Sequence, residues 1–304
     1  MSYQNTIARP VSTEGIGLHT GVPVRVRLVP APSGTGIVFR RVDLEGFAIK
    51  AIAKNVARVS YATSLMRKGV LISTTEHLLS ALAASRIDNV FIEIDNLEVP
   101  IMDGSALPFL RLIQEAGLKR QRAAQTWAKV VRPVEIVEGE KRISIHPADD
   151  FRITYRIVFN HPLIGEQERS FTMSQSGYER AIAPARTFGF IDEVEMLRKS
   201  GLVRGGSLDN AVVLTRTGVM NPEGLRFPDE FCRHKILDVI GDLALLGHPI
   251  VGHVVAERAG HAMHVALVNK LLHEKTALKL VRTTRAAITK SRIETSAVAV
   301  SPAS

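Results

Sequence analysis

The strongest chemical signal in the sequence is a histidine and an aspartate four residues apart, His234 and Asp238. On an α-helix, such positions lie about 40° apart around the axis and about 6 Å along it. The two side chains would therefore project from one face and could bind one metal ion, and Asp242 continues that face. Zinc accepts imidazole and carboxylate ligands and keeps one position open for water in catalytic sites. The spacing alone favours a surface ion pair that supports the helix, whereas the apolar residues between them indicate a buried helix whose polar groups need partners.

A second candidate is Glu76-His77, where an acid directly precedes a histidine near the start of an expected helix. His77 could be a third metal ligand, and Glu76 could be the base that takes a proton from an activated water. The local sequence favours another interpretation. Ser73-x-x-Glu76 matches a capping box, in which the glutamate only hydrogen-bonds to the start of the helix.

Two further segments leave their roles open. His261 follows Gly260 at the start of an expected helix, and His264 lies three residues further on. Either could donate a proton near neutral pH, and their spacing does not choose between them. Phe188 and Phe190 could be ordinary core or could line an apolar pocket, and the glycine pair at 205–206 lacks the spacing of a known nucleotide loop. The remaining histidines and the single cysteine show no ligand spacing, so we interpret most of them as structural.

Hydrophobic periodicity predicts the elements that must position these residues. Strands are expected at 22–28, 36–40, 90–94, 129–137, 142–146, 151–159 and 250–257, and helices at 74–84, 107–116, 174–181, 231–246 and from 260 onward. The polar segment 119–126 has no clear period and is interpreted as a linker. The order of elements predicts an α+β fold of two similar domains, each a mostly antiparallel sheet packed on helices, at 1–124 and 125–290, with a flexible tail at 291–304. Together the domains would form a layered sandwich with the active site at the interdomain seam.

Composition limits the partners of the chain. Its formal net charge of +9 fits nucleic acid, an anionic membrane surface or an anionic substrate, and also general solubility. Aromatic residues make up only 5% and are not interleaved with the basic ones, which argues against a nucleic-acid platform. We expect a cytoplasmic protein without stable membrane insertion, because the chain has one cysteine, no apolar leader and no run of about 18 apolar residues.

Taken together, these segments resemble the UDP-3-O-acyl-N-acetylglucosamine deacetylases of lipid A biosynthesis. The match extends from Gly15 to His261, and its segments are 15–21, 73–79, 100–105, 159–162, 185–190, 205–209, 234–242 and 260–261. The resemblance implies a zinc-dependent hydrolase that removes the N-acetyl group from a UDP-linked acylated amino sugar. The products would be the free amine and acetate, early in lipopolysaccharide synthesis.

The resemblance also implies roles for the matching positions. One zinc ion would be held by His77, His234 and Asp238. The implied catalytic residues are Glu76 as general base, His261 as general acid, Asp242 as its partner, Thr187 at the oxyanion and Lys235 beside the sugar or diphosphate. The implied substrate contacts are Phe188, Phe190, Lys235 and Arg258 and, along an acyl passage, Val194, Val203, Gly206, Ser207, Ala211 and Val213. Arg258 replaces a lysine of the family, and Asn210 is more polar than an acyl passage suggests.

Two alternatives to this assignment stay open. One is a zinc deacetylase that acts on another acylated amino sugar. The other is a basic protein that binds RNA or an anionic membrane, in which His234 and Asp238 are only structural. For the deacetylase we expect a monomer whose only nucleotide partner is the UDP moiety of the substrate, with membrane contact at most peripheral.

Overall fold

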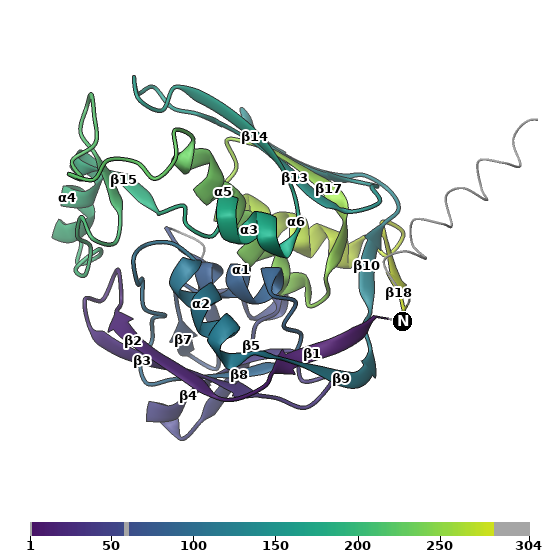
Figure 1. The fold of residues 1–304 in the computed structure, drawn as a ribbon. Helices are drawn as coiled ribbons and strands as arrows, with labels where there is room; N and C mark the ends of the chain where they lie inside the picture. Colours follow the sequence, from purple (N-terminus) through teal and green to yellow (C-terminus); the bar gives the residue numbers. More distant parts are fainter. Residues whose placement is uncertain (1, 58–60, 283–304) are drawn as a thin grey trace, which may run out of the picture.

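The computed structural model describes residues 2–57 and 61–282, so the tail expected at 291–304 lies outside the described residues. Two sheets enclose a layer of helices between them, and each half of the chain supplies one sheet (Figure 1). The predicted α+β sandwich is confirmed. The division at residues 124 and 125 falls between two strands, β9 and β10, and stays a prediction.

The sheet of the first half has five strands. Their spatial order is β2 (Val11–Ile16), β3 (Pro23–Pro30), β8 (Val90–Ile94), β4 (Ile37–Arg41) and β5 (Phe47–Lys50). In β3, buried Val24, Val26 and Leu28 alternate with exposed residues, so one face of the strand is apolar. The inner side of this sheet carries α1 (Glu76–Ala84) and α2 (Leu107–Ala116) (Figure 1).

The sheet of the second half has seven strands. Five of them follow the order β11 (Val134–Glu138), β12 (Lys141–His146), β17 (Ile250–Glu257), β10 (Trp127–Val130) and β18 (Leu278–Val281). The remaining two are β13 (Phe151–Val158), which pairs with β17 in parallel, and β14 (Glu166–Thr172). The helices of this half are α3 (Gln175–Ala181), α5 (Glu230–Leu243) and α6 (His261–His273).

Smaller elements complete the structure. They are the strand pairs β1 (Tyr3–Ile7) with β9 (Leu118–Ala124), β6 (Leu65–Arg67) with β7 (Val70–Ile72), and β15 (Phe188–Phe190) with β16 (Val212–Leu214), helix α4 (Ile191–Lys199), and the short 3₁₀ helices η1 (Val42–Leu44), η2 (Ala53–Asn55) and η3 (Ala244–Leu246). None of the described helices combines the length and the apolar composition that a membrane crossing requires.

Two expected elements differ from the structure. The segment 119–126, interpreted as a linker, largely forms strand β9, which pairs with β1 from Tyr3↔Ala124 to Ile7↔Leu118. The side chains of β9 are mostly exposed, so its sequence lacks the hydrophobic alternation that would predict a strand. The single strand expected at 129–137 is two strands, β10 and β11, because Pro133 between them cannot donate to a sheet ladder.

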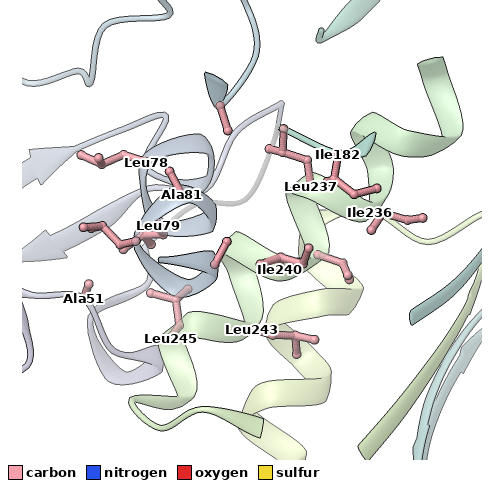
Figure 2. Close-up of a cluster of buried hydrophobic side chains, with 14 of the residues drawn as sticks. Ala51, Leu78, Leu79, Ala81, Ile182, Ile236, Leu237, Ile240, Leu243 and Leu245 are labelled. Atoms are coloured by element: carbon pink, nitrogen blue, oxygen red, sulfur yellow. The ribbon is translucent and has the colours of Figure 1, made fainter. Parts of the chain in front are cut away.

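Helices α1 and α5 form the centre of the core. Leu78, Leu79 and Ala81 from α1 and Ile236, Leu237, Ile240 and Leu243 from α5 are buried together (Figure 2). The two helices approach most closely at Gly241, where an added Cβ would lie 2.1 Å from the backbone oxygen of Glu76. Only glycine allows this approach, and it brings the first turn of α1 against the last turn of α5.

Candidate active site

Three buried side chains from the two halves of the chain converge where α1 meets α5. His234 and Asp238 lie one turn apart on α5, and His77 is the second residue of α1. The Oδ1 atom of Asp238 lies 3.3 Å from Nε2 of His234 and 3.8 Å from Nε2 of His77. The two imidazole rings are nearly perpendicular, with centroids 5.0 Å apart. Side chains that are distant in the sequence therefore present three ligand atoms to one point.

The spacing of these atoms fits a zinc ion. Tetrahedral ligands at about 2.1 Å from the metal lie about 3.4 Å from one another, close to the separations of the Asp238 oxygen from the two imidazoles. That Oδ1 atom is buried and, among the described residues, has no hydrogen-bond partner. His234 Nδ1 donates to the backbone oxygen of Ala185 at 3.0 Å, which leaves the Nε2 lone pair free to bind a cation.

The protonation states of the three side chains suit a divalent cation. Burial lowers the pKa of His77 to about 3 and also lowers that of His234, so both imidazoles are neutral near pH 7. Burial acts to raise the pKa of Asp238, but His234 and Lys235 outweigh it and hold that pKa below its ordinary value. The Lys235 ammonium lies 2.7 Å from Oδ2 of this carboxylate. The donor set is two neutral imidazoles and one carboxylate, as in catalytic zinc sites.

Glu76 does not cap its helix. Helix α1 begins at Glu76 itself, its N-cap is Thr75, and the Ser73 hydroxyl donates to the backbone oxygen of Leu97. Instead, Oε2 of Glu76 accepts from the backbone N–H of Thr63 at 3.1 Å. The capping-box interpretation is therefore wrong.

Glu76 has the protonation behaviour of a base that works near neutral pH. Burial is the main reason that its pKa is raised to about 7; His261 opposes the rise, and the carboxylates of Asp242 and Asp238 add to it. Its other oxygen, Oε1, lies 4.0 Å from Nε2 of His261. A carboxylate with this pKa can both accept and release a proton at pH 7.

The structure distinguishes the two histidines of α6, which begins at His261 after Gly260 as its N-cap. Both donate through Nδ1 to Oδ2 of Asp242, His261 at 2.7 Å and His264 at 2.8 Å. His261 turns Nε2 toward Glu76, whereas His264 is fully buried with Nε2 at 3.2 Å from the Tyr155 hydroxyl. Only His261 therefore presents a free ring nitrogen to the metal-ligand cluster.

Asp242 controls the charge of His261. Burial acts to lower the pKa of His261, but Asp242 and Asp238 outweigh it and raise that pKa to about 9. Burial likewise opposes ionisation of Asp242, yet its contacts with His261 lower the pKa of this carboxyl to about 2. The Thr63 hydroxyl donates to Oδ1 of Asp242 at 2.5 Å. Because its carboxylate and both Nδ1 atoms are joined by short hydrogen bonds, we interpret this second His/Asp group as a proton-donor assembly rather than a second metal site.

A pocket of about 200 Å³ opens beside the ligand cluster. Its lining residues are Phe159, Thr187, Phe188, Gly189, Phe190, Glu193, His234 and Lys235. The Phe188 ring lies edge-on to the ring of Phe231, with centroids 4.9 Å apart, and the Lys235 ammonium lies 5.8 Å from its centroid. The site thus joins an aromatic wall and a cation to the three ligand atoms.

Comparison with known proteins identifies the family. A family model described as UDP-3-O-acyl N-acetylglycosamine deacetylase matches residues 4–273. The chain is also similar to three proteins named UDP-3-O-acyl-N-acetylglucosamine deacetylase. It is 52% identical to that of Solibacter usitatus (92% of this chain and 95% of the relative covered), and 47% identical to those of Syntrophotalea carbinolica (94% and 93%) and Myxococcus xanthus (91% and 89%). The chain belongs to this deacetylase family.

The family resemblance assigned a wider set of substrate contacts than the pocket contains. Val194 lies on α4, Val203, Gly206, Ser207 and Ala211 lie in the loop after it, and Val213 lies in β16. Their role in an acyl passage stays a prediction. Arg258 forms an ion pair with Glu140. Its contact with a UDP-sugar, as expected for this deacetylase family, also stays a prediction.

The unexpected polarity of Asn210 has a structural explanation. Its Oδ1 accepts from the backbone N–H of Ser207, and its Nδ2 donates to the backbone oxygen of Gly205, each at 2.9 Å. The side chain is buried and shapes this loop through its own hydrogen bonds, so the polar residue is compatible with an apolar passage in a deacetylase.

Three residues of the site escaped the sequence analysis. Thr63 hydrogen-bonds to both Glu76 and Asp242, but it lies in an irregular segment where no periodicity draws attention to it. Phe159 and Glu193 line the pocket. Phe159 begins one of the segments, 159–162, that resembled the deacetylase family, and this was the one signal that could have pointed to it.

Proposed function

We propose that this chain is a zinc-dependent deacetylase that hydrolyses the N-acetyl group of UDP-3-O-acyl-N-acetylglucosamine, giving the free amine and acetate early in lipid A synthesis. The observation that supports it best is the convergence of His77, His234 and Asp238 beside Glu76 and a protonated His261. The names of relatives at 47–52% identity supply the substrate. We further propose that it acts in the cytoplasm as a monomer.

Amide hydrolysis needs an activated water, a charge sink for the oxyanion and a proton for the leaving nitrogen. A zinc ion held by His77, His234 and Asp238 would lower the pKa of water and polarise the acetyl carbonyl. Glu76 takes a proton from the attacking water, and its pKa of about 7 suits this role. The new bond joins the water oxygen to the acetyl carbon, and the carbon–nitrogen bond breaks.

His261 supplies the proton to the leaving nitrogen. Its pKa of about 9 keeps it protonated at neutral pH, and Asp242 holds Nδ1 so that Nε2–H faces the reacting groups. The departing amine leaves as a neutral group once it has accepted this proton. Because Asp242 stays ionised, it stabilises the charged imidazole without taking its proton.

The remaining pocket residues bind and orient the substrate. The Thr187 hydroxyl donates to the developing oxyanion, and Lys235 binds the sugar or the diphosphate together with Arg258. Phe188 and Phe190 flank the sugar and the start of the acyl chain. The chain continues along the predicted passage, Val194, Val203, Gly206, Ser207, Ala211 and Val213, where each buried CH₂ contributes about 0.8 kcal/mol.

Metal content and turnover together test this proposal. Purified protein should contain one zinc ion, lose deacetylation after chelation and regain it with added zinc. Asp238→Asn should lose both metal and turnover. The matched control is Asp95→Asn, because Asp95 is exposed and its Oδ1 accepts from the backbone N–H of Arg25, which an amide oxygen can also do. A folded, metal-free protein without hydrolysis would instead favour the binding-protein alternative.

Substrate choice separates the two enzymatic alternatives. The UDP-linked acylated sugar should be hydrolysed much faster than the same sugar without UDP. Equal rates on both would favour a deacetylase for another acylated amino sugar.

A further inference from the structure

A second, larger cavity lies at the C-terminal end of α1, whereas His77 lies at the N-terminal end of this helix. Its volume is about 460 Å³, within the range of small-molecule sites. Ala83 and Ala84 at the end of α1 and Ile240 and Leu243 at the end of α5 contribute to its wall. Along α1, Ala84 is about 10 Å from His77. Among the described residues that line the cavity, none belongs to the cluster or pocket of the candidate active site.

The lining of the cavity is mixed. It includes apolar residues such as Ile52, Leu243 and Leu246 and polar residues such as Asn5, Asp88 and Gln125. A ligand that satisfies both kinds of group would carry an apolar body and a polar head.

Trp127 marks the place of the polar head. Its indole ring lines the cavity and the residue is only 6% exposed. Among the described residues, no group accepts a hydrogen bond from its buried Nε1–H. A buried donor without a partner costs stability, and such groups usually mark a place for an acceptor. The guanidinium of Arg86 lies over the same ring, 6.0 Å from its centre, so a cationic donor is near the indole.

The charges of the lining favour an anionic head. Lys50 and Arg86 are cations, and burial lowers the pKa of His248, so this histidine is neutral at pH 7. The opposing charge is Asp88, whose oxygens accept from the backbone N–H of Asn5 and from the Gln125 amide, each at 2.7 Å. Burial raises the pKa of Asp88 to about 6, so it is mostly ionised at pH 7, and the two cations outnumber this one negative charge.

We propose that this cavity binds a small organic acid with an apolar body, whose carboxylate accepts hydrogen bonds from Trp127 Nε1 and the Arg86 guanidinium. The ligand would contact the C-terminal ends of α1 and α5, the two helices that also carry the metal-ligand candidates. This inference goes beyond the proposed deacetylation, and its test does not require turnover.

The test uses the full-length, metal-loaded protein and fluorescence of Trp127, which is the only tryptophan of the chain. Decanoate is the probe, and decanol and decyltrimethylammonium are probes of equal chain length without the negative charge. Decanoate should change the emission with saturation at one site and bind at least ten-fold more tightly than either of the other two. Equal binding of decanoate and decanol, or no change of emission with decanoate, would overturn the proposal.

Variants show whether the signal comes from this cavity. Arg86→Gln should weaken decanoate binding at least ten-fold without changing basal deacetylation. Its matched control is Arg67→Gln, since Arg67 also lies over an aromatic ring, at 5.7 Å from the centroid of Phe47, but does not line the cavity. Ala83→Phe adds a ring to the cavity wall and should abolish the response. Unchanged decanoate affinity in both Arg86→Gln and Ala83→Phe, in folded protein, would refute the site.

Discussion

Replacement of Glu76 by glutamine should abolish most turnover and yet stabilise the metal-depleted protein. The amide oxygen of glutamine can still accept from the backbone N–H of Thr63, so the local fold is kept. The variant cannot take a proton from water, and the loss of a general base typically costs about 10²- to 10⁴-fold in rate. Zinc binding should persist, because Glu76 is not one of the three ligand candidates.

The stabilisation follows from the raised pKa of Glu76. Burial raises this pKa from 4.5 to about 7, so the folded state binds the proton more tightly than the unfolded state. The stability that this provides is complete below pH 4.5 and is lost as the pH rises through 7. A rise of this pKa from 4.5 to about 7, at about 1.4 kcal/mol for each tenfold change in proton affinity, corresponds to about 3 kcal/mol. Glutamine resembles the protonated form. The free energy of unfolding of the variant should therefore equal that of the wild type at pH 4.5 and exceed it by up to this amount at pH 8.

Urea unfolding of chelator-treated protein at both pH values measures this difference, and a deacetylation assay on the zinc-loaded protein measures turnover. Glu98→Gln is the matched control, since Glu98 is equally buried but accepts from the backbone N–H groups of His19 and Thr20 and from the Thr74 hydroxyl. Its amide cannot accept at both oxygen positions, so this control should lose stability. Normal turnover of Glu76→Gln, or a loss of about 1 kcal/mol at pH 8 as for a helix cap, would refute the reasoning.

Three other perturbations have defined outcomes. Thr63→Val removes the hydroxyl that donates to Asp242 and should lower kcat about ten-fold, whereas Thr63→Ser keeps a hydroxyl and should keep kcat. Equal kcat values in the two variants would exclude a contribution of this hydrogen bond to turnover. Burial raises the pKa of Asp88 from 3.8 to about 6, so the free energy of unfolding of Asp88→Asn, relative to that of the wild type, should rise by up to about 3 kcal/mol from pH 4 to pH 8. Urea unfolding measures this difference, and a difference that does not change with pH would contradict the prediction. Gly241→Ala places a Cβ 2.1 Å from the backbone oxygen of Glu76 and should destabilise the protein by about 3 kcal/mol or more, which thermal unfolding would measure; an unchanged melting temperature would show that the helices can separate freely.

The sequence predicted several of the elements that bury an apolar face, although not the short buried strand β16. Strands β8 and β17 and helix α2 begin and end at the expected residues, because each combines a clear hydrophobic period with a turn residue or polar segment at its ends. Strand β9 was missed because its side chains are mostly exposed and only its backbone pairing with β1 defines it. Periodicity reports burial, so an element held by backbone hydrogen bonds alone gives no such signal.

The site was predictable where its residues share one helix, and less so where they meet through the fold. Spacing on α5 brought His234 and Asp238 to one face, but it could not distinguish a metal site from an ion pair. That distinction depends on His77, which only the packing of α1 against α5 brings to within 3.8 Å of Asp238. The choice of His261 over His264 likewise depends on where α6 lies relative to Asp242, which no local pattern encodes.

The neighbouring carboxyls Glu76 and Asp242 are equally buried, yet their pKa values move in opposite directions. Burial dominates at Glu76, whose carboxyl accepts from the backbone N–H of Thr63, and its pKa rises to about 7. At Asp242, the charge of His261 and the hydrogen bonds from His261 and His264 outweigh burial and lower its pKa to about 2. The partners around each carboxyl, rather than its depth, therefore decide which of the two can exchange a proton at neutral pH. Separated pKa values of this kind support the proposal that Glu76 is the base and Asp242 the fixed negative charge that keeps His261 protonated.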